Sequence, residues 1–318
     1  MNRPLLDLKT PPLLTCASTQ ALCIARARAG APEGTCVRAL EQTEGRGRGE
    51  HRWHSAPGLG LYLSFLLRPK VSRSLWPGLT PLVALALAET LDSYATPCAV
   101  PDAASGAGCG TGSDAGSEDG GSAAPRLMIK WPNDVFGRRG KVAGILADVV
   151  GEAGTAFPPE QSAGVVVGVG INLAHREADF PPEIRGKASS LFLEGIDPLP
   201  AFDGLAIRLN ERLTFRYRQF QNALRDVDLE FLRRELLSRF FLQGARVRIR
   251  TGLDPAGARH PIEETTVDQA GGRSTDRIEG TARDLGPLGE LILATSEGDR
   301  VIVSGEVESW SRPSGESR

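Results

Sequence analysis

The spacing of apolar and polar residues predicts four helices in the first 243 residues of the chain. The first is Thr19–Ala29, and Gly30 ends it because glycine readily leaves the helical conformation. Leu79–Tyr94 is apolar on nearly every turn, which indicates a helix buried on most of its surface. Phe202–Gln221 and Leu229–Phe241 are amphipathic, and we expect their apolar stripes to belong to the core.

Short apolar runs between turn residues predict strands. In the same part of the chain these are Cys36–Gln42, Leu59–Arg68, Arg126–Trp131, Val142–Val150, Gly164–Val169 and Ile171–Leu173. After Gly244 the helical spacing stops, and short strands follow at Arg246–Arg250, Gly280–Asp284, Glu290–Ala294, Arg300–Val303 and Val307–Trp310. This tail has the size of a small β-barrel. We therefore predict an α+β fold, with a mixed β-sheet and flanking helices over residues 1–243 and a compact all-β domain over residues 244–318.

Composition and charge are those of an ordinary globular protein. The chain has 318 residues, of which 41% are apolar and 24% charged, enough for one large domain and a small one. Its formal charge of −2 gives no general attraction to nucleic acid or to an anionic membrane. We expect no membrane span, because no run of about 20 apolar residues is apparent. The five cysteines form no CxxC pair, so we expect a cytoplasmic protein with reduced thiols.

Two segments interrupt the predicted elements. Residues 96–125 consist largely of Gly, Ala, Ser and Asp, and they lack the large apolar side chains that offset the entropy of ordering a chain. We expect a disordered insertion there. Residues 251–277 carry several glycines, two prolines and many charges, which is typical of a long loop in the small domain. Neither segment is expected to hold the chemistry.

Gln42–Gly49, which reads QTEGRGRG, is the first candidate for chemistry. Its glycines allow backbone N–H groups to approach a ligand closely, and Arg46 and Arg48 offer permanent planar cations suited to carboxylate or phosphate. With Arg52 and Trp53, which follow, these residues could form a flexible anion clamp. On composition alone, an RNA-binding Arg/Gly tract or a solvated loop explains them equally well. The segment is neither a P-loop nor a dinucleotide-binding fingerprint, because the lysine or glycine spacing that each requires is absent.

Two further segments place polar residues at the ends of predicted strands. Lys130–Asp134 reads KWPND, and its proline ends the strand so that Asn133 and Asp134 stand beyond it. A carboxylate there suits a Mg²⁺ ion bound to nucleotide phosphates. In Gly140–Leu146, Lys141 opens an apolar strand with small residues behind it, which leaves room for a ligand. Local chemistry alone favours the alternatives, which are a plain Pro-Asn-Asp turn and a lysine in solvent.

The remaining signals are weaker when each is taken singly. Gly168–Leu173 is an apolar strand broken by glycines and one amide, and Ser304–Val307 is an ordinary hairpin signal. His51 and His54 flank Trp53, but no cysteine or carboxylate nearby completes a zinc set. Neither metal nor nucleophile chemistry stands out from these residues.

The order and spacing of these segments resemble the biotin protein ligase family. The matching segments run from about residue 12 to residue 310, apart from the two insertions, and comprise Ser18-Thr19, QTEGRGRG with RW, KWPNDV, GKVAGIL, GVGINL and SGEV. The resemblance implies the biotin/lipoate ligase fold, which is similar to class II synthetases, with an SH3-like barrel at the C-terminus. It also implies a ligase that converts ATP and biotin to biotinyl-5′-AMP with Mg²⁺. The biotin would then pass to a lysine of a biotin carboxyl carrier protein.

The resemblance implies a role for each matching residue. Biotin binding would involve Ser18, Thr19, Gln20, Gln42, Arg46, Gly47, Arg48, Lys141 and Gly144. ATP binding would involve Arg46, Trp53, Lys130, Asn133, Asp134, Lys141 and Asn172. Arg48, Lys141 and Asp134 are implied to be catalytic. The cations would bring two anions together, the carboxylate would organise Mg²⁺-bound phosphates, and the closed loop would protect the adenylate from water.

Some features depart from the usual family pattern. Gln20 stands where asparagine is frequent, Glu44 where a small residue is common, and His51 where a basic residue is frequent. These departures concern the details of loop closure. Only about 15 residues precede the catalytic domain, so we expect no DNA-binding helix-turn-helix of the kind that some relatives carry, and a ligase without repressor activity.

Three other interpretations compete with this one. A lipoate ligase shares the fold and the acyl-adenylate chemistry, but it is expected to lack KWPND and the GRGRG loop. A nucleic-acid-binding protein would be expected to have a positive net charge and more aromatic residues than the 6% found here. A biotin-binding sensor without catalysis disagrees with the presence of Arg48, Asp134 and Lys141. The resemblance implies an acetyl-CoA or pyruvate carboxylase subunit as the usual partner, and it leaves both a monomer and a homodimer open.

Overall fold

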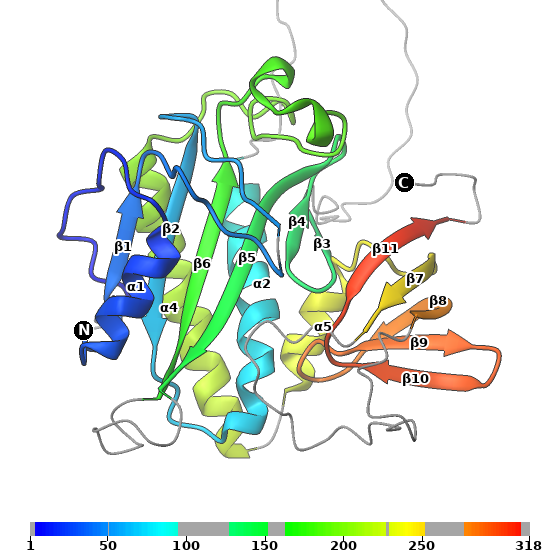
Figure 1. Cartoon of the computed structure of the whole chain (residues 1–318). Helices are drawn as coiled ribbons and strands as arrows, with labels where there is room; N and C mark the ends of the chain where they lie inside the picture. The colour runs from blue at the N-terminus through cyan, green and yellow to red at the C-terminus, as the bar shows by residue number, and fades with distance from the viewer. Residues whose placement is uncertain are drawn as a thin grey trace, which may run out of the picture.

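The computed structural model describes residues 4–49, 51–94, 127–151, 163–226, 229–251 and 277–312. The insertion expected at 96–125 lies outside these residues, as does nearly all of the loop expected at 251–277. The described chain forms a six-stranded sheet with helices on both faces, followed by a five-stranded sheet (Figure 1). This is the α+β architecture that the sequence predicts.

The larger sheet has the strand order β1-β2-β6-β5-β4-β3. Its strands are β1 (Cys36–Ala39), β2 (Gly60–Leu67), β3 (Met128–Lys130), β4 (Asp134–Phe136), β5 (Lys141–Val150) and β6 (Gly164–Asn172). All pairs between these strands are antiparallel. Parallel pairing enters the sheet only through isolated bridges among the described residues, such as Leu13 with Ala39 and Ile129 with Phe240. The expected mixed sheet therefore has a small parallel component at its edges.

Two details of this sheet differ from the sequence prediction. The segments expected as Gly164–Val169 and Ile171–Leu173 form one strand, β6, because Gly170 stays in the ladder between Tyr62 and Gly144. The strand β4 is an addition, since its three residues are too short for an apolar alternation to reveal.

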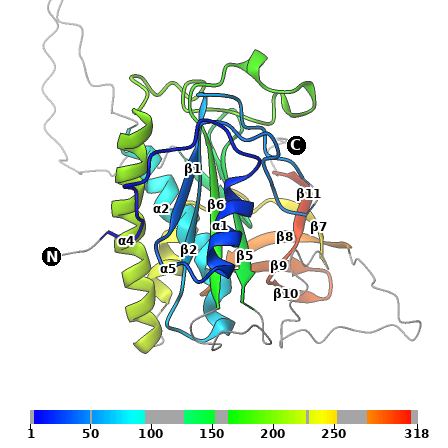
Figure 2. The same cartoon turned by 60° about the vertical axis from the view of Figure 1, so that its left-hand side comes forward.

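The helices sit on opposite faces of the sheet (Figure 2). On one face, α1 (Thr19–Arg28) packs against β1, β2 and β6. Ser18 caps its N-terminus by accepting from the Ala21 N–H (3.4 Å), and Gly30 follows its C-terminus with a φ of 83°. The other face is covered by α2 (Leu79–Asp92), which follows a 3₁₀ turn at Arg73–Gly78. Behind α2 lie α4 (Phe202–Asp226) and α5 (Glu230–Leu237).

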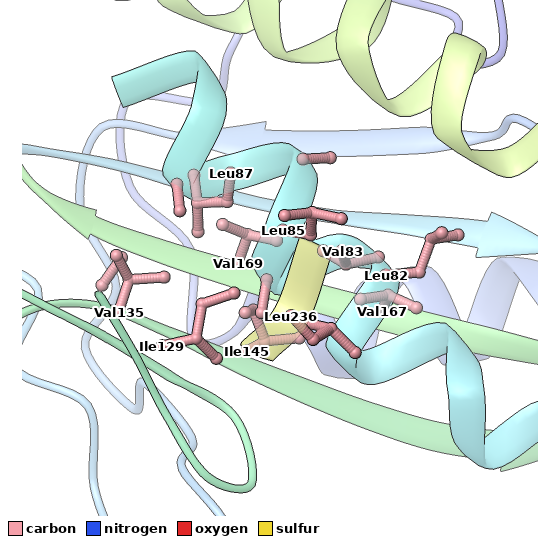
Figure 3. Close-up of a cluster of buried hydrophobic side chains, with 14 of the residues drawn as sticks. Leu82, Val83, Leu85, Leu87, Ile129, Val135, Ile145, Val167, Val169 and Leu236 are labelled. Carbon is pink, nitrogen blue, oxygen red and sulfur yellow. The ribbon is translucent and has the colours of Figure 1, made fainter. Parts of the chain in front are cut away.

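The main core lies between α2 and the sheet (Figure 3). Leucines and valines of α2, such as Leu82 and Val83, meet Val167 and Val169 of β6 there. Contrary to the sequence expectation, one segment is long and apolar enough to span a membrane: Arg73–Asp92, with a mean hydropathy of 1.2. Inside the fold 72% of that stretch is buried, so its apolar character is that of a core helix.

The C-terminal part is an antiparallel sheet with the order β10-β9-β8-β7-β11. Its strands are β7 (Arg246–Arg250), β8 (Arg277–Leu285), β9 (Leu291–Thr295), β10 (Gly298–Ile302) and β11 (Glu306–Ser311). It corresponds to the small all-β part that the sequence predicts. The Nε1–H of Trp131 donates to the carbonyl of Gly289 (3.1 Å), and this hydrogen bond joins the KWPND segment to the second sheet.

Candidate functional site

A cavity opens on the face of the large sheet that carries α1. Its volume is about 460 Å³, the open mouth included. The residues of the sequence prediction that line it are Ser18, Thr19, Gln20, Gln42, Arg46, Gly47, Arg48, Trp53, Asn133, Lys141 and Gly144. Thus the fold brings together residues from the start of α1, the Arg/Gly loop, the KWPND turn and β5. Three of the predicted residues, Lys130, Asp134 and Asn172, do not line this cavity directly.

Side chains alternate between the two faces of a sheet, so every second residue of β2, β5 and β6 faces the cavity floor, and several of these residues are small. One row across β2, β6 and β5 is Ser64, Gly168 and Leu146. The next row contains Gly170 and Gly144 side by side. A Cβ added to Gly170 would lie 2.5 Å from the Trp53 ring, and one on Gly168 would lie 2.5 Å from Gln20 Oε1. Glycine is therefore required at these two positions, where the side chains of Gln20 and Trp53 lie against the sheet.

Polar side chains at the α1 end of the cavity form a connected network. Gln42 Oε1 accepts from both the N–H (2.8 Å) and the hydroxyl (3.0 Å) of Thr19. The Gln42 amide then donates to Ser55 Oγ (3.0 Å), while the hydroxyls of Thr19 and Ser64 share a hydrogen bond of 2.9 Å. Since the network holds these groups in place, a polar ligand meets donors and acceptors that are already oriented.

Cations gather at the other end of the cavity. Lys141 Nζ lies 2.7 Å from Asp134 Oδ1 and 5.1 Å from the centre of the Trp53 ring. Burial lowers the pKa of Lys130, and the opposing effect of Asp134 is smaller. Burial likewise lowers the pKa of Arg48 despite Asp134 and Glu306, but an arginine titrates so far above neutrality that it stays charged. This end therefore suits an anion.

The segment Gln42–Gly49, together with Arg52 and Trp53, is called the Arg/Gly loop here. It folds back on itself and is hydrogen-bonded to the C-terminal sheet. Within the loop, the N–H of Trp53 donates to the carbonyl of Gly45 (2.9 Å). Arg48 Nη1 donates to the carbonyl of Gly305 (2.8 Å), and His51 Nε2 lies 3.0 Å from Glu306 Oε1. The SGEV segment, a plain hairpin signal in the sequence, thus holds the loop from outside the large sheet.

Glu306 is the central group of this tether. Burial favours the neutral acid, but hydrogen bonds from Arg250 (2.5 Å) and His51 hold the pKa of Glu306 below its ordinary value. The carboxylate is therefore ionised at neutral pH and accepts from both sheet and loop.

The three predicted residues outside the cavity have identifiable places. Asp134 does not line the cavity, but it forms an ion pair with Lys141, which does. Lys130 lies opposite Asp134 in the β3–β4 pair. Asn172 is buried, and its amide donates to the carbonyls of Ser189 (2.9 Å) and Lys141 (3.4 Å). It therefore fixes the backbone around Lys141.

The cavity also contains residues to which the sequence analysis gave no individual role, although five of them lie in its candidate segments Gly140–Leu146 and Gly168–Leu173. The lining residues without a prediction are Leu63, Ser64, Ile145, Leu146, Gly168, Val169 and Gly170. All come from β2, β5 or β6. The glycines at every second position near the end of β6, which the sequence analysis noted only as a broken strand, are typical of a strand that faces a ligand.

Comparison with known proteins places these features in a family. Residues 18–172 match the family model described as the biotin/lipoate A/B protein ligase family. A biotin–[acetyl-CoA-carboxylase] ligase of Mycobacterium tuberculosis is 30% identical over 292 residues, which are 91% of this chain and 85% of that protein. The bifunctional ligase/repressor BirA of Bacillus subtilis is 33% identical over 175 residues, or 55% of this chain. That match spans 43% of the Bacillus protein, less than half its length.

Solved structures show the same fold. The biotin protein ligase from Aquifex aeolicus in complex with biotin and ATP superposes with a TM-score of 0.61 and 24% sequence identity. The superposition covers 95% of this chain and 98% of that one. This chain therefore has the same fold as that structure.

Proposed function

The chain belongs to the biotin protein ligase family, and from that premise we propose that it activates biotin with ATP and transfers it to a lysine of a carrier protein. The observation that carries this proposal is the two-ended cavity. Hydroxyl and amide groups of Thr19, Gln42 and Ser64 stand at one end, and Lys141 and Arg48 stand at the other. A ligand with a polar uncharged head and a carboxylate tail, such as biotin, fits that division.

In the first step, a carboxylate oxygen of biotin attacks the α-phosphorus of ATP, and pyrophosphate leaves. Both reactants are anions, so cations must hold them together. Lys141 is placed for this, because its Nζ lies 3.1 Å from the position of a Cβ on Gly144, in the cavity floor. Arg48 is carried by the loop and held by Gly305, and exposed Arg46 extends the positive charge to the mouth.

In the second step, the amine of a carrier lysine attacks the acyl carbon of biotinyl-5′-AMP. An amide forms and AMP leaves. Until the carrier arrives, the adenylate must be kept from water. Arg46, Gly47, Arg48 and Trp53 of the loop line the cavity, and the tether to the C-terminal sheet would hold them there as a cover.

Mg²⁺, which the family implies, fits this site as an ion that arrives with ATP. Among the residues described, no group of three or more His, Cys, Asp and Glu side chains gathers to hold a metal. Asp134 is paired with Lys141, and Mg²⁺ is commonly bound by one or two carboxylates together with phosphate oxygens. Asp134 would hold the ion, which would offset phosphate charge. We place the nucleotide near Trp53, Asn133 and Lys130.

The carrier is proposed to be the biotin carboxyl carrier protein of an acetyl-CoA carboxylase or a similar carboxylase. The support is that two relatives, from Mycobacterium tuberculosis and Paracoccus denitrificans, are biotin–[acetyl-CoA-carboxylase] ligases. The second relative is 34% identical over 138 residues.

Pyrophosphate release tests the first step. The protein is incubated with Mg-ATP and biotin, with lipoate, or with neither, and Lys141→Ala is compared with Lys70→Ala. Lys70 is an exposed lysine away from the cavity and serves as the matched control. We expect biotin-dependent release that collapses in Lys141→Ala and persists in Lys70→Ala. Release with lipoate alone would identify a lipoate ligase instead, and no release with either acid would refute the proposal.

A further inference from the structure

One buried polar atom in the cavity has no partner. Gln20 is 3% exposed, and its Oε1 accepts no hydrogen bond from any residue that the structure describes. The same side chain lines the cavity, with Oε1 lying over Gly168 of the floor. A buried acceptor without a donor is unfavourable, so its presence beside a cavity indicates a ligand that brings the donor.

The nitrogen of the same amide is fully engaged. Gln20 Nε2 donates to Asp148 Oδ2 (2.9 Å) and to the carbonyl of Val166 (3.1 Å). Asp148 and Val166 lie opposite each other on β5 and β6, one row beyond Gly168. Turning the amide over would set its oxygen against a carboxylate and a carbonyl, both acceptors. These two groups therefore fix the amide so that the oxygen faces the cavity.

We propose that Asp148 is a positioning residue that holds the Gln20 amide in one orientation. The α1 end of the cavity then selects a ligand whose head group carries an N–H donor. The ring urea of biotin has such donors, whereas the dithiolane ring of lipoate has none. A site built around a polar partner rejects an analogue that lacks it, because the buried group is left unpaired. This inference rests on the proposed function and adds to it the basis for choosing biotin over lipoate.

Calorimetric titration with biotin tests the proposal. The variants are Gln20→Met, which keeps the length of the side chain and removes the acceptor, and Asp148→Val, which suits a strand and cannot accept. We expect each to raise the Kd for biotin roughly tenfold, as the loss of one hydrogen bond in a buried site predicts. Asp148→Asn keeps one side-chain oxygen as an acceptor and should stay within about threefold of wild type. Gln219→Met, the same chemical change away from the cavity, is the matched control.

The double variant separates positioning from general damage. If Asp148 acts through Gln20, then Gln20→Met with Asp148→Val binds biotin no more weakly than Gln20→Met alone. The Kd for ATP should stay at its wild-type value, since neither residue lies at the cationic end of the cavity. Asp148→Ala provides a second test if Asp148→Val does not fold.

Each outcome decides between the two proposals. Wild-type binding of biotin with no loss in Asp148→Val and Asp148→Ala would overturn the positioning role and leave the proposed function standing. Additive losses in the double variant would also overturn it, because Asp148 would then act independently of Gln20. A wild-type protein that binds no biotin would overturn both.

Discussion

Replacing Gly170 with alanine should cost the protein both stability and activity. The added Cβ would lie 2.5 Å from Cε2, 2.6 Å from Nε1 and 2.9 Å from Cζ2 of Trp53. Carbon atoms in favourable contact are about 3.5–4.0 Å apart, so the rigid indole would have to move by about 1 Å. Trp53 ends the Arg/Gly loop, and its displacement would lift the loop from the sheet.

The size of the effect follows from the packing. Forcing an extra methyl group into a packed site costs about 1–3 kcal/mol. Suppose that this free energy destabilises only the arrangement in which Trp53 lies on the sheet. The ratio of that arrangement to one with the loop lifted then falls by about 5-fold to 150-fold. Thermal unfolding should show a melting temperature lower by roughly 2–4 °C for each kcal/mol. Biotin-dependent pyrophosphate release should fall in parallel.

Gly204→Ala is the matched control. Gly204 lies in α4, and a Cβ there would meet nothing within 4 Å. Alanine is the better helix former by about 0.5–1 kcal/mol, so this variant should melt slightly higher with unchanged activity. If Gly170→Ala matches wild type in melting and in turnover, the contact between Trp53 and the sheet is not part of the working site, and the reasoning is refuted.

Three further predictions concern charge. Arg48→Ala should slow biotin-dependent pyrophosphate release by roughly 10²–10³-fold, the usual effect of losing one group that stabilises developing charge. Glu306→Gln should lower the melting temperature at neutral pH, and this loss relative to wild type should shrink as the pH falls. The lowered pKa of Glu306 contributes stability above its ordinary value near 4.5, and that contribution is lost as pH falls through the folded-state pKa. Burial, and to a smaller extent the nearby His54, lower the pKa of His175 to about 4. The unfolded chain therefore binds the proton more readily, and melting temperature should fall from pH 6.5 toward 4, less steeply in His175→Leu.

These predictions have distinct failures. Wild-type turnover in Arg48→Ala would contradict the first. For the second, the gap in melting temperature between wild type and Glu306→Gln must shrink on acidification, so a constant gap would show that its ionised form is not what stabilises the fold. An identical pH profile for wild type and His175→Leu would contradict the third.

Much of the fold could be predicted because several of its elements are long, nearly continuous apolar runs. The buried helix α2 and the strands β2 and β5 are of this kind. The strand β4 could not, since three residues show no period, and β6 was divided because glycine inside a strand resembles a break. The small C-terminal strands were foreseen to within a few residues from turn residues alone.

The sequence predicted those parts of the site that consist of short local motifs. It did not predict the contacts between residues far apart in the chain. The motif residues around Arg48 and Lys141 do converge on one cavity. The pairing of Gln20 with Asp148 joins residues 128 positions apart, and that of Arg48 with Gly305 joins residues 257 positions apart. No spacing rule predicts such pairs, because only the register of the sheets and the packing of one sheet beside the other creates them.

The tether between the Arg/Gly loop and the C-terminal sheet has a consequence for biosynthesis. A chain leaves the ribosome N-terminus first, and its parts fold in that order. The cavity floor can form once β6 has emerged, but Gly305 and Glu306 emerge some 130 residues later, with β11. During that interval the nascent protein has the cavity, but the Arg/Gly loop lacks its hydrogen bonds to Gly305 and Glu306. If the protein makes the adenylate as proposed, full protection of that intermediate would become available only when translation has passed β11.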